Sequence, residues 1–325
     1  RNVLGVDAAI LFADLLPILE PMGFQLEYLK GEGPVIHNPL GRSNDVDRVR
    51  ALEDVNELSY VFDAVRLIRS ELPDDIPLLG FAGAPFTLAS YAIEGGGSKN
   101  YVSTKSLMFG DPEAWDVLMT KLVDSLSRYL HAQIEAGCQA VQIFDSWAGA
   151  LAPSEFRRWC QVPAARIVST LHARHPDVPV IGFPRGCGGL LAEYAASTGV
   201  DVIALDTGVD PAWADRVLPP GLPVQGNLDP LALIAGGTAL QQAVAGILAA
   251  LGDRPHVFNL GHGILPQTPP DNVAALLRLL QDADLPHAPR TAVPALVQAV
   301  DALVAVRGRV AAAAPAAASL GGRGL

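Results

Sequence analysis

The chain has 325 residues, of which 50% are hydrophobic and 18% charged, and it carries 31 glycines and 26 prolines. This composition is typical of a soluble α/β protein and excludes a disordered or fibrous one. The formal net charge of −11 argues against nucleic acid or a membrane surface as a partner, because binding phosphates requires a positive field. Since no apolar run of membrane-spanning length is uninterrupted and no signal peptide is visible, we expect a cytoplasmic protein.

Short apolar runs rich in Val, Ile, Leu or Phe recur along the chain, and each is followed by a helical stretch. The runs are continuous rather than alternating, which predicts strands buried on both faces, as in a parallel sheet. We predict seven such strands, at residues 6–14, 76–85, 140–146, 178–186, 201–208, 222–230 and 256–263.

The helices between these strands carry recognisable signals at their ends. Asp111, followed by a proline, predicts the N-cap of a long helix, and Gly137 predicts its end. A helix with Ser154 as its N-cap is predicted after the third strand. Later helices are predicted over 188–199 and 238–252.

Alternation of strand and helix indicates either a doubly wound sheet or a (β/α)₈ TIM barrel. The Rossmann fingerprint GxGxxG does not follow the first strand, which favours the barrel. A closed barrel needs eight strands, and the chain starts at Arg1 rather than Met, so we expect its natural N-terminus and first strand to be missing. We expect a single barrel domain over 1–285, and over 286–325 a C-terminal helix with a disordered Ala/Gly-rich tail.

Three cysteines, Cys138, Cys160 and Cys187, lie far apart in the sequence and form no CxxC or HxC pair. This pattern argues against a disulfide framework and against a cysteine-rich zinc site. We therefore expect reduced thiols.

The carboxyl ends of the strands carry the functional site in a barrel. Here these ends offer Asp14, Gly83–Pro85, Asp145–Ser146, Arg185, Asp206, Asn227–Asp229 and His262, which predicts a cleft with several carboxylates, a serine and one histidine. Structural alternatives exist, because Asp14 could cap the following segment and His262 could satisfy a structural hydrogen bond. The glycines on both sides of His262 favour the close approach of a ligand.

A glycine-rich segment, SYAIEGGGSKNY at residues 90–101, follows the second predicted strand. Its spacing does not match GxxxxGK[ST], so we expect a flexible loop or lid over a pocket rather than a phosphate-binding loop. Tyr91, near its start, could equally pack in the core or at its rim. No GxSxG elbow surrounds Ser146, which argues against a serine hydrolase that pairs it with His262.

In chain order, the segments DAAILFAD, GFAGAPFTLASYAIEGGGSKNY, FDSWAGALAP, QGNLDP and NLGHGILPQTPPDNV resemble the uroporphyrinogen decarboxylase family. The resemblance runs from Val6 to about Leu280. It implies a (β/α)₈ barrel that forms a homodimer and uses no cofactor or metal. It also implies that the tetrapyrrole uroporphyrinogen III loses its four acetate carboxylates as CO₂, giving coproporphyrinogen III in haem biosynthesis.

The resemblance assigns roles to individual residues. The family's essential aspartate falls on Asp14, with Ala13 in place of the usual serine, and we expect Asp14 to be catalytic and to contact the substrate. The positions of the family's substrate-contacting tyrosine, strand-end polar residue, histidine and pocket phenylalanine fall on Tyr91, Ser146, His262 and Phe81.

The chain departs from the family at one motif. The family's signature arginines, which bind substrate carboxylates, lie in an RQAGR motif at the first barrel strand, and this motif is absent from the 325 residues. Arg185 is the one strand-end arginine, and it cannot replace two. We expect the 325-residue chain to be inactive and the full-length protein to be active.

Two other functions are compatible with parts of the sequence. A sister class on the same barrel transfers methyl groups with zinc and a corrinoid, but it needs an HxC pair and a further cysteine, which are not found at that spacing here. A non-catalytic tetrapyrrole-binding protein is the other alternative. The retained Asp14, Tyr91, Ser146 and His262 argue against it, and the missing arginines argue for it.

Overall fold

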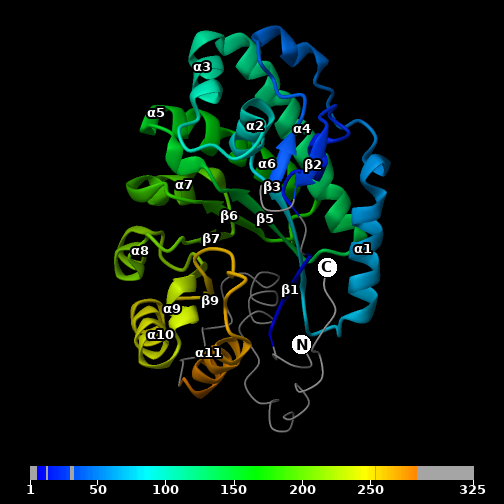
Figure 1. Ribbon diagram of the computed structural model, residues 1–325. Helices are drawn as coiled ribbons and strands as arrows, with labels where there is room; N and C mark the ends of the chain where they lie inside the picture. Colours follow the sequence, from blue (N-terminus) through cyan, green and yellow to red (C-terminus); the bar gives the residue numbers. More distant parts are fainter. Residues whose placement is uncertain (1–5, 12–13, 30–32, 253, 284–325) are drawn as a thin grey trace.

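The structure, a computed structural model, describes residues 6–11, 14–29, 33–252 and 254–283. Its centre is a seven-stranded sheet in the order β1-β4-β5-β6-β7-β8-β9, in which every neighbouring pair is parallel (Figure 1). The strands are β1 (Ala9–Ile10), β4 (Leu78–Gly83), β5 (Ala140–Asp145), β6 (Val180–Pro184), β7 (Val202–Ala204), β8 (Val224–Leu228) and β9 (His256–Leu260), and a separate hairpin pairs β2 (Leu26–Leu29) with β3 (Gly33–Ile36).

Each of the seven predicted apolar runs contains one of these parallel strands, which confirms the seven strands and the α/β barrel class. The runs are continuous because both sides of the sheet are covered. Every residue of β4, β6, β7 and β8 is buried. Among the residues described, β1 and β9 form the two edges of the sheet.

The sheet is curled rather than flat. Gln225 on β8 donates a hydrogen bond of 3.2 Å to Gln142 on β5, although β6 and β7 separate these two strands. Three strand spacings in a flat sheet would hold the two side chains roughly 14 Å apart. The bond therefore requires the concave face to close on itself, and the two amides lie in the interior of a partial barrel.

A helix follows each strand of the sheet, and Figure 1 shows the helices around its outside. The helices are α1 (Ser59–Glu71), α2 (Pro85–Glu94), α3 (Val102–Gly110), α4 (Pro112–Ala136), α5 (Pro153–Phe156), α6 (Val162–Arg174), α7 (Leu191–Thr198), α8 (Pro211–Val217), α9 (Pro230–Ala235), α10 (Gly237–Leu251) and α11 (Pro270–Asp282).

Two of the predicted helix caps can be compared directly with the structure. The prediction for α4 is confirmed, because the Asp111 side chain accepts a hydrogen bond from the Ala114 amide and Gly137 is the C-cap. The prediction for Ser154 is wrong. The helix begins at a proline, Pro153, and the Ser154 hydroxyl donates to its neighbour Glu155 instead of capping the helix.

The buried side chains form two cores. The larger lies between the sheet and the helices and includes Trp115, Phe86, Phe156 and Tyr194. The smaller lies on the other face of the sheet, inside the curl, and consists of Leu79, Ala140, Ile181, Phe183, Val202 and Ala204. Filling the inside with side chains makes the partial barrel a packed body rather than a pore.

The β2–β3 hairpin was not predicted from the sequence, and it explains part of the glycine-rich segment. The Ile36 amide donates to the Gly95 carbonyl at 2.8 Å. A Cβ atom at Gly96 would lie 3.3 Å from the Pro34 carbonyl. Residues 95 and 96 of the predicted lid are therefore glycines because the hairpin backbone packs closely against them.

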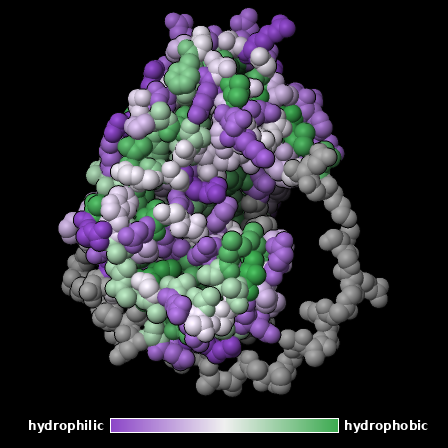
Figure 2. Space-filling view, turned by 60° about the vertical axis from the view of Figure 1, so that its left-hand side comes forward, coloured by the Kyte–Doolittle hydropathy of each residue, from purple (hydrophilic) through white to green (hydrophobic). Residues whose placement is uncertain are grey.

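The surface described by the structure mixes polar and apolar side chains. Figure 2 shows hydrophilic and hydrophobic residues interspersed, with a larger hydrophobic group in the lower half of that face. In the described part of the chain, no helix has the length and apolar character needed to cross a lipid bilayer. The C-terminal helix and tail predicted for 286–325 lie outside the described residues.

Candidate active site

The predicted site residues all lie at one rim of the sheet. Parallel strands place their carboxyl ends on the same side. Asp14 follows β1, Ser146 follows β5 and His262 follows β9, while Tyr91 lies on α2, the helix directly after β4. The topology therefore gathers side chains that are far apart in the sequence.

A row of phenylalanine rings lies on the inner face below this rim. Phe81 on β4 and Phe144 on β5 pack edge to face, with ring centroids 5.9 Å apart and an interplanar angle of 82°. Phe144 packs on Phe183 of β6 in the same way, at 5.9 Å and 78°. Phe81, predicted to line the pocket, thus belongs to an aromatic floor built by three neighbouring strands.

Asp14 makes both a local and a long-range contact. Its carboxylate accepts a hydrogen bond of 3.0 Å from the Leu16 amide, so it does cap the following turn. It also accepts a hydrogen bond from the Tyr28 hydroxyl of the β2–β3 hairpin. Burial raises the pKa of Asp14, and these hydrogen bonds oppose that rise. Burial and then the charge of Asp14 raise the pKa of Tyr91 to about 12, so Asp14 and Tyr91 are electrostatic neighbours.

Tyr91 continues into an aromatic group along the rim. Its ring stacks on Trp147, with centroids 4.0 Å apart and an interplanar angle of 28°. Trp147 in turn meets Tyr101 edge-on at 5.1 Å. The Trp147 amide donates to the Thr87 hydroxyl at 3.2 Å, which fixes the base of this group.

Beyond Tyr101, the rim carries a positive charge. Arg185, which follows β6, is close enough to the Tyr101 hydroxyl to oppose the rise in its pKa that burial causes. Burial and then the charge of Arg185 lower the pKa of His262, against the opposing effect of Asp206. Ring contacts join Tyr91, Trp147 and Tyr101, and electrostatic interactions extend this row to Asp14 at one end and to Arg185 and His262 at the other. We call these six residues the rim arc.

Ser146 and the glycines around His262 have different surroundings. Ser146 is half-buried and directly precedes Trp147 in the rim arc. A Cβ atom at Gly261 would lie 2.5 Å from the Thr207 amide nitrogen, whereas a Cβ atom at Gly263 would have no neighbour within 4 Å. Gly261 is therefore required by the packing of two loops of the protein, and only Gly263 leaves open space beside His262.

Several strand-end carboxylates predicted for the cleft instead accept hydrogen bonds from other groups of the protein. Asp206 accepts hydrogen bonds from the Gly186 and Gly208 amides, at 2.6 and 2.7 Å. Asp229 caps α9 through the Leu231 amide. Asp145 is buried and accepts hydrogen bonds from Thr87, at 2.7 Å, and from the Cys160 thiol. Asp14 thus remains the carboxylate of the rim arc.

Replacing Asp145 with asparagine is expected to flatten the pH dependence of the free energy of unfolding between about pH 4 and 6. Burial raises the pKa of Asp145 to about 6 from 3.8, although hydrogen bonds from Cys160 and Thr87 oppose it. The folded protein therefore keeps a proton that the unfolded chain releases, so this stabilisation is present at low pH and is lost as pH rises through the window. The loss amounts to about 3 kcal/mol.

Urea unfolding across this pH range measures the effect. Burial also raises the pKa of Asp7 to about 6, so the Asp145→Asn variant should keep roughly half of the wild-type slope, if Asp7 contributes equally. The exposed Asp116, replaced in the same way, is the control and should leave the slope unchanged. Equal slopes for Asp145→Asn and the wild type would contradict the prediction.

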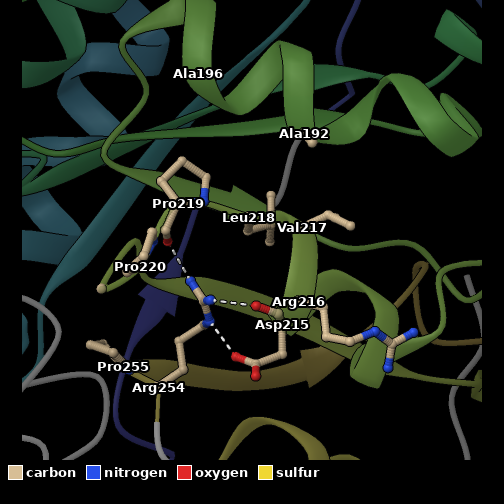
Figure 3. A pocket seen from close by; sticks show the side chains of 11 residues that line it. Ala192, Ala196, Asp215, Arg216, Val217, Leu218, Pro219, Pro220, Arg254 and Pro255 are labelled. Carbon is tan, nitrogen blue, oxygen red and sulfur yellow. Dashed lines mark hydrogen bonds and ion pairs between the residues drawn. The ribbon is translucent and has the colours of Figure 1, made fainter.

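The opposite end of the barrel holds a pocket of about 600 Å³, lined by residues from α7, α8 and the segments before β8 and β9 (Figure 3). Arg254 occupies it with its side chain only 6% exposed. Its guanidinium donates to the Asp215 carboxylate at 2.9 Å and to the carbonyls of Pro219, Leu222 and Asp215. Every part of the guanidinium is engaged by the protein, so this site joins segments of the fold together.

No group of three or more His, Cys, Asp or Glu side chains suited to a metal ion occurs within the described ranges. Cys138, Cys160 and Cys187 are free and buried, and burial raises the pKa of each thiol. The donor set that a zinc-dependent methyltransferase requires is thus not assembled by these cysteines.

The structure adds residues to the site that the sequence did not single out. They are Tyr28, Tyr101, Phe144, Trp147 and Phe183. Phe144, Trp147 and Phe183 share a detectable signal, because each lies within three residues of the end of a predicted strand. Tyr28 and Tyr101 carry no such signal, since they reach the rim from the hairpin and from the segment before α3.

Comparisons with known proteins agree with this geometry. The family model described as uroporphyrinogen decarboxylase (URO-D) matches residues 1–283. The uroporphyrinogen decarboxylase of Rhizorhabdus wittichii is 52% identical over 275 residues, which cover 84% of this chain and 78% of that protein. The uroporphyrinogen decarboxylase of Granulibacter bethesdensis is 46% identical over 280 residues, covering 85% and 81%.

Among solved structures, a methyltransferase from Methanosarcina mazei superposes with a TM-score of 0.70 over 85% of this chain and 80% of that one. At 19% sequence identity, this likeness concerns the fold alone. The match of the family model over nearly all of the described residues, together with relatives at 46% and 52% identity, decides the assignment. The chain therefore belongs to the uroporphyrinogen decarboxylase family.

Proposed function

We propose that the protein decarboxylates uroporphyrinogen III, releasing its four acetate carboxylates as CO₂ and giving coproporphyrinogen III for haem biosynthesis. The observation that carries the proposal is the rim arc, which sets the carboxylate of Asp14 and the cation of Arg185 on one rim above the phenylalanine floor. A macrocycle of four pyrrole rings with carboxylates at its edge matches these features. Membership of the family supports the same substrate.

The chemistry replaces each carboxylate by a proton. Protonation of a pyrrole ring first turns that ring into an electron sink beside its acetate group. The bond between the methylene carbon and the carboxylate then breaks, CO₂ leaves, and the electron pair enters the ring. Protonation of the methylene carbon and loss of the ring proton leave a methyl group. The protein has to stabilise the cationic ring more strongly than the neutral one.

Asp14 is the residue we assign to that task. A carboxylate fixed near the pyrrole N–H groups gains interaction energy as the ring becomes cationic, in a site from which water is excluded. The hydrogen bonds from Leu16 and Tyr28 hold the carboxylate before the reaction begins. Preorganisation of this kind avoids a reorganisation cost in the transition state.

The other predicted residues orient the substrate in this proposal. Tyr91, Ser146 and His262 donate hydrogen bonds to its acetate or propionate carboxylates, and Phe81 contacts the face of the macrocycle. Large apolar side chains are also exposed beyond β8 and β9, at Leu231, Ile264 and Leu265 (62%, 56% and 37% exposed). Covering them with the macrocycle would remove apolar surface from water.

The decisive test is anaerobic turnover of uroporphyrinogen III by protein expressed from its complete reading frame. The product is oxidised and read as coproporphyrin. Release of four CO₂ per substrate is the expected result. Binding with all eight carboxylates left in place would reject catalysis and favour a non-catalytic tetrapyrrole-binding protein.

Replacing His262 with alanine is expected to raise the KM about tenfold, because one hydrogen bond to a charged group is lost. Burial and the charge of Arg185 lower the pKa of His262, so a neutral imidazole supplies this bond through its N–H group. Steady-state kinetics would measure it, with His37→Ala, an exposed histidine bonded to Glu27, as the control. Full affinity and turnover in His262→Ala would contradict the assignment.

A zinc- and corrinoid-dependent methyl transfer is not favoured. The relatives at 46% and 52% identity are decarboxylases, and the three cysteines provide no HxC pair. Methyl transfer would require a site that binds zinc, and metal analysis of the purified protein distinguishes the two functions.

We further propose that the protein works as a cytoplasmic homodimer that binds neither nucleic acid nor membranes. The net charge of −11 and the free, buried cysteines support this setting, and the dimer follows from the resemblance to the family. Sedimentation of the purified protein at micromolar concentration measures the oligomeric state.

A further inference from the structure

Arg185 differs from the arginines that serve the fold. The guanidinium of Arg69 donates to the carbonyls of Ile76, Leu72 and Pro73, and that of Arg254 is also saturated by protein acceptors. Arg185 is half-buried, yet within the described ranges its guanidinium has no hydrogen bond or ion pair. Its donors are therefore available to a ligand.

The backbone around Arg185 is held by three neighbouring connections. The Arg185 amide donates to the Asp145 carbonyl at 3.1 Å, and the Arg185 carbonyl accepts from the Gly149 amide at 2.9 Å. The next amide, that of Gly186, donates to the Asp206 carboxylate. A Cβ atom at Gly149 would lie 2.7 Å from the Gly186 carbonyl oxygen, so these two turns are in direct contact. The backbone that carries the Arg185 side chain is thus held in place by neighbouring turns of the protein.

The groups that face Arg185 suit an anion. Tyr101 and His262 are its electrostatic neighbours, and both are neutral hydrogen-bond donors near pH 7, because burial raises the pKa of the first and lowers that of the second. Asp206 is the nearby negative charge, and both of its oxygens accept backbone amides. A guanidinium with unused donors, in electrostatic range of a hydroxyl and an imidazole N–H group, suits a planar anion that accepts several hydrogen bonds.

We propose that Arg185 binds a carboxylate of the substrate, flanked by Tyr101 and His262 as hydrogen-bond donors. The identity of the ligand as a tetrapyrrole carboxylate rests on the proposed function, whereas the anion site itself rests on the geometry. Arg185 is thereby a substrate-binding residue on the side of the rim opposite Asp14 in the rim arc. A bound carboxylate also places a negative charge beside His262, so binding raises the pKa of that imidazole.

The test uses uroporphyrin, the stable oxidised form with eight carboxylates, in fluorescence titrations with wild-type protein, Arg185→Gln, Arg185→Lys and Arg166→Gln. Arg166 pairs with Asp124 on the outer helices and is the matched control. We expect Arg185→Gln to weaken binding about tenfold, Arg185→Lys to weaken it by roughly threefold because the bidentate fork is lost, and Arg166→Gln to have no effect.

A second measurement separates a binding role from a structural one. NMR titration of the imidazole should show a higher pKa for His262 in unliganded Arg185→Gln than in the wild type, because a neighbouring positive charge is gone. In the wild type, uroporphyrin should raise that pKa. Thermal unfolding shows whether Arg185→Gln is folded, and Arg185→Lys, which keeps the charge, carries the test if it is not.

The outcomes distinguish this inference from the proposed function. If the wild-type protein releases CO₂ and the uroporphyrin affinity of Arg185→Gln and Arg185→Lys is unchanged, the Arg185 site is overturned and the proposed function stands. Binding that depends on Arg185 without turnover supports the anion site and rejects decarboxylation. Wild-type protein that neither binds uroporphyrin nor releases CO₂ overturns both.

Discussion

Replacing Asp14 with asparagine is expected to lower the turnover of uroporphyrinogen III by about a hundred- to a thousand-fold, which is the loss typical of removing one preorganised electrostatic group. Asparagine keeps the size of the side chain and can still accept the hydrogen bond from Leu16. It removes the negative charge that is proposed to stabilise the cationic pyrrole ring. The effect should therefore fall on kcat more than on KM.

Asp54 offers a matched control for this variant. It is exposed and accepts a hydrogen bond from the amide two residues on, that of Asn56, at 2.9 Å, which is the local geometry that Asp14 has with Leu16. Asp54→Asn should leave turnover within twofold of the wild type. If Asp14→Asn retained wild-type kcat in the same anaerobic assay, the charge of Asp14 would not be part of the mechanism.

Replacing Arg254 with alanine is expected to cost roughly 3 kcal/mol of unfolding free energy, or about 5 °C in the melting temperature. The change removes a nearly buried guanidinium and leaves the Asp215 carboxylate without its partner. It also leaves the carbonyls of Pro219 and Leu222 without donors. Because the pocket lies at the end of the barrel away from the rim, turnover of the folded fraction should stay unchanged.

Arg216 lines the same pocket and provides the control. In Figure 3 its side chain points away from Arg254, and it is exposed. Arg216→Ala should change the unfolding free energy by less than about 0.5 kcal/mol. Calorimetry of both variants would reject the structural role of Arg254 if the two melting temperatures fell equally.

The fold could be predicted to the extent that local pattern reflects burial. The seven strands were predicted because strands covered on both faces form nearly continuous apolar runs. The hairpin was missed because its strands are only partly buried and neither alternate nor run continuously, and because Pro34 lies within one of them. A proline inside a short run argues against a strand unless that strand lies at an edge.

The site was predicted only in part for a different reason. Sequence shows that a residue ends a strand, but not toward which face its side chain points. Phe144 points inward to the phenylalanine floor, so its neighbour Asp145 points outward, toward Thr87 and Cys160, and is buried behind the rim. The ring contact of Tyr101 with Trp147 and its electrostatic interaction with Arg185 join three separate connections, and no local pattern encodes them.

The β2–β3 hairpin connects the Asp14 carboxylate with the glycine-rich segment at residues 95 and 96. Tyr28, on β2, supplies a hydrogen bond to Asp14, while its partner strand β3 packs on the glycines at residues 95 and 96. A side chain larger than hydrogen at residue 96 would push on the hairpin backbone rather than on the rim. The hydrogen bond that Tyr28 gives to the carboxylate proposed as catalytic is therefore linked, through the hairpin, to a glycine that does not contact that carboxylate.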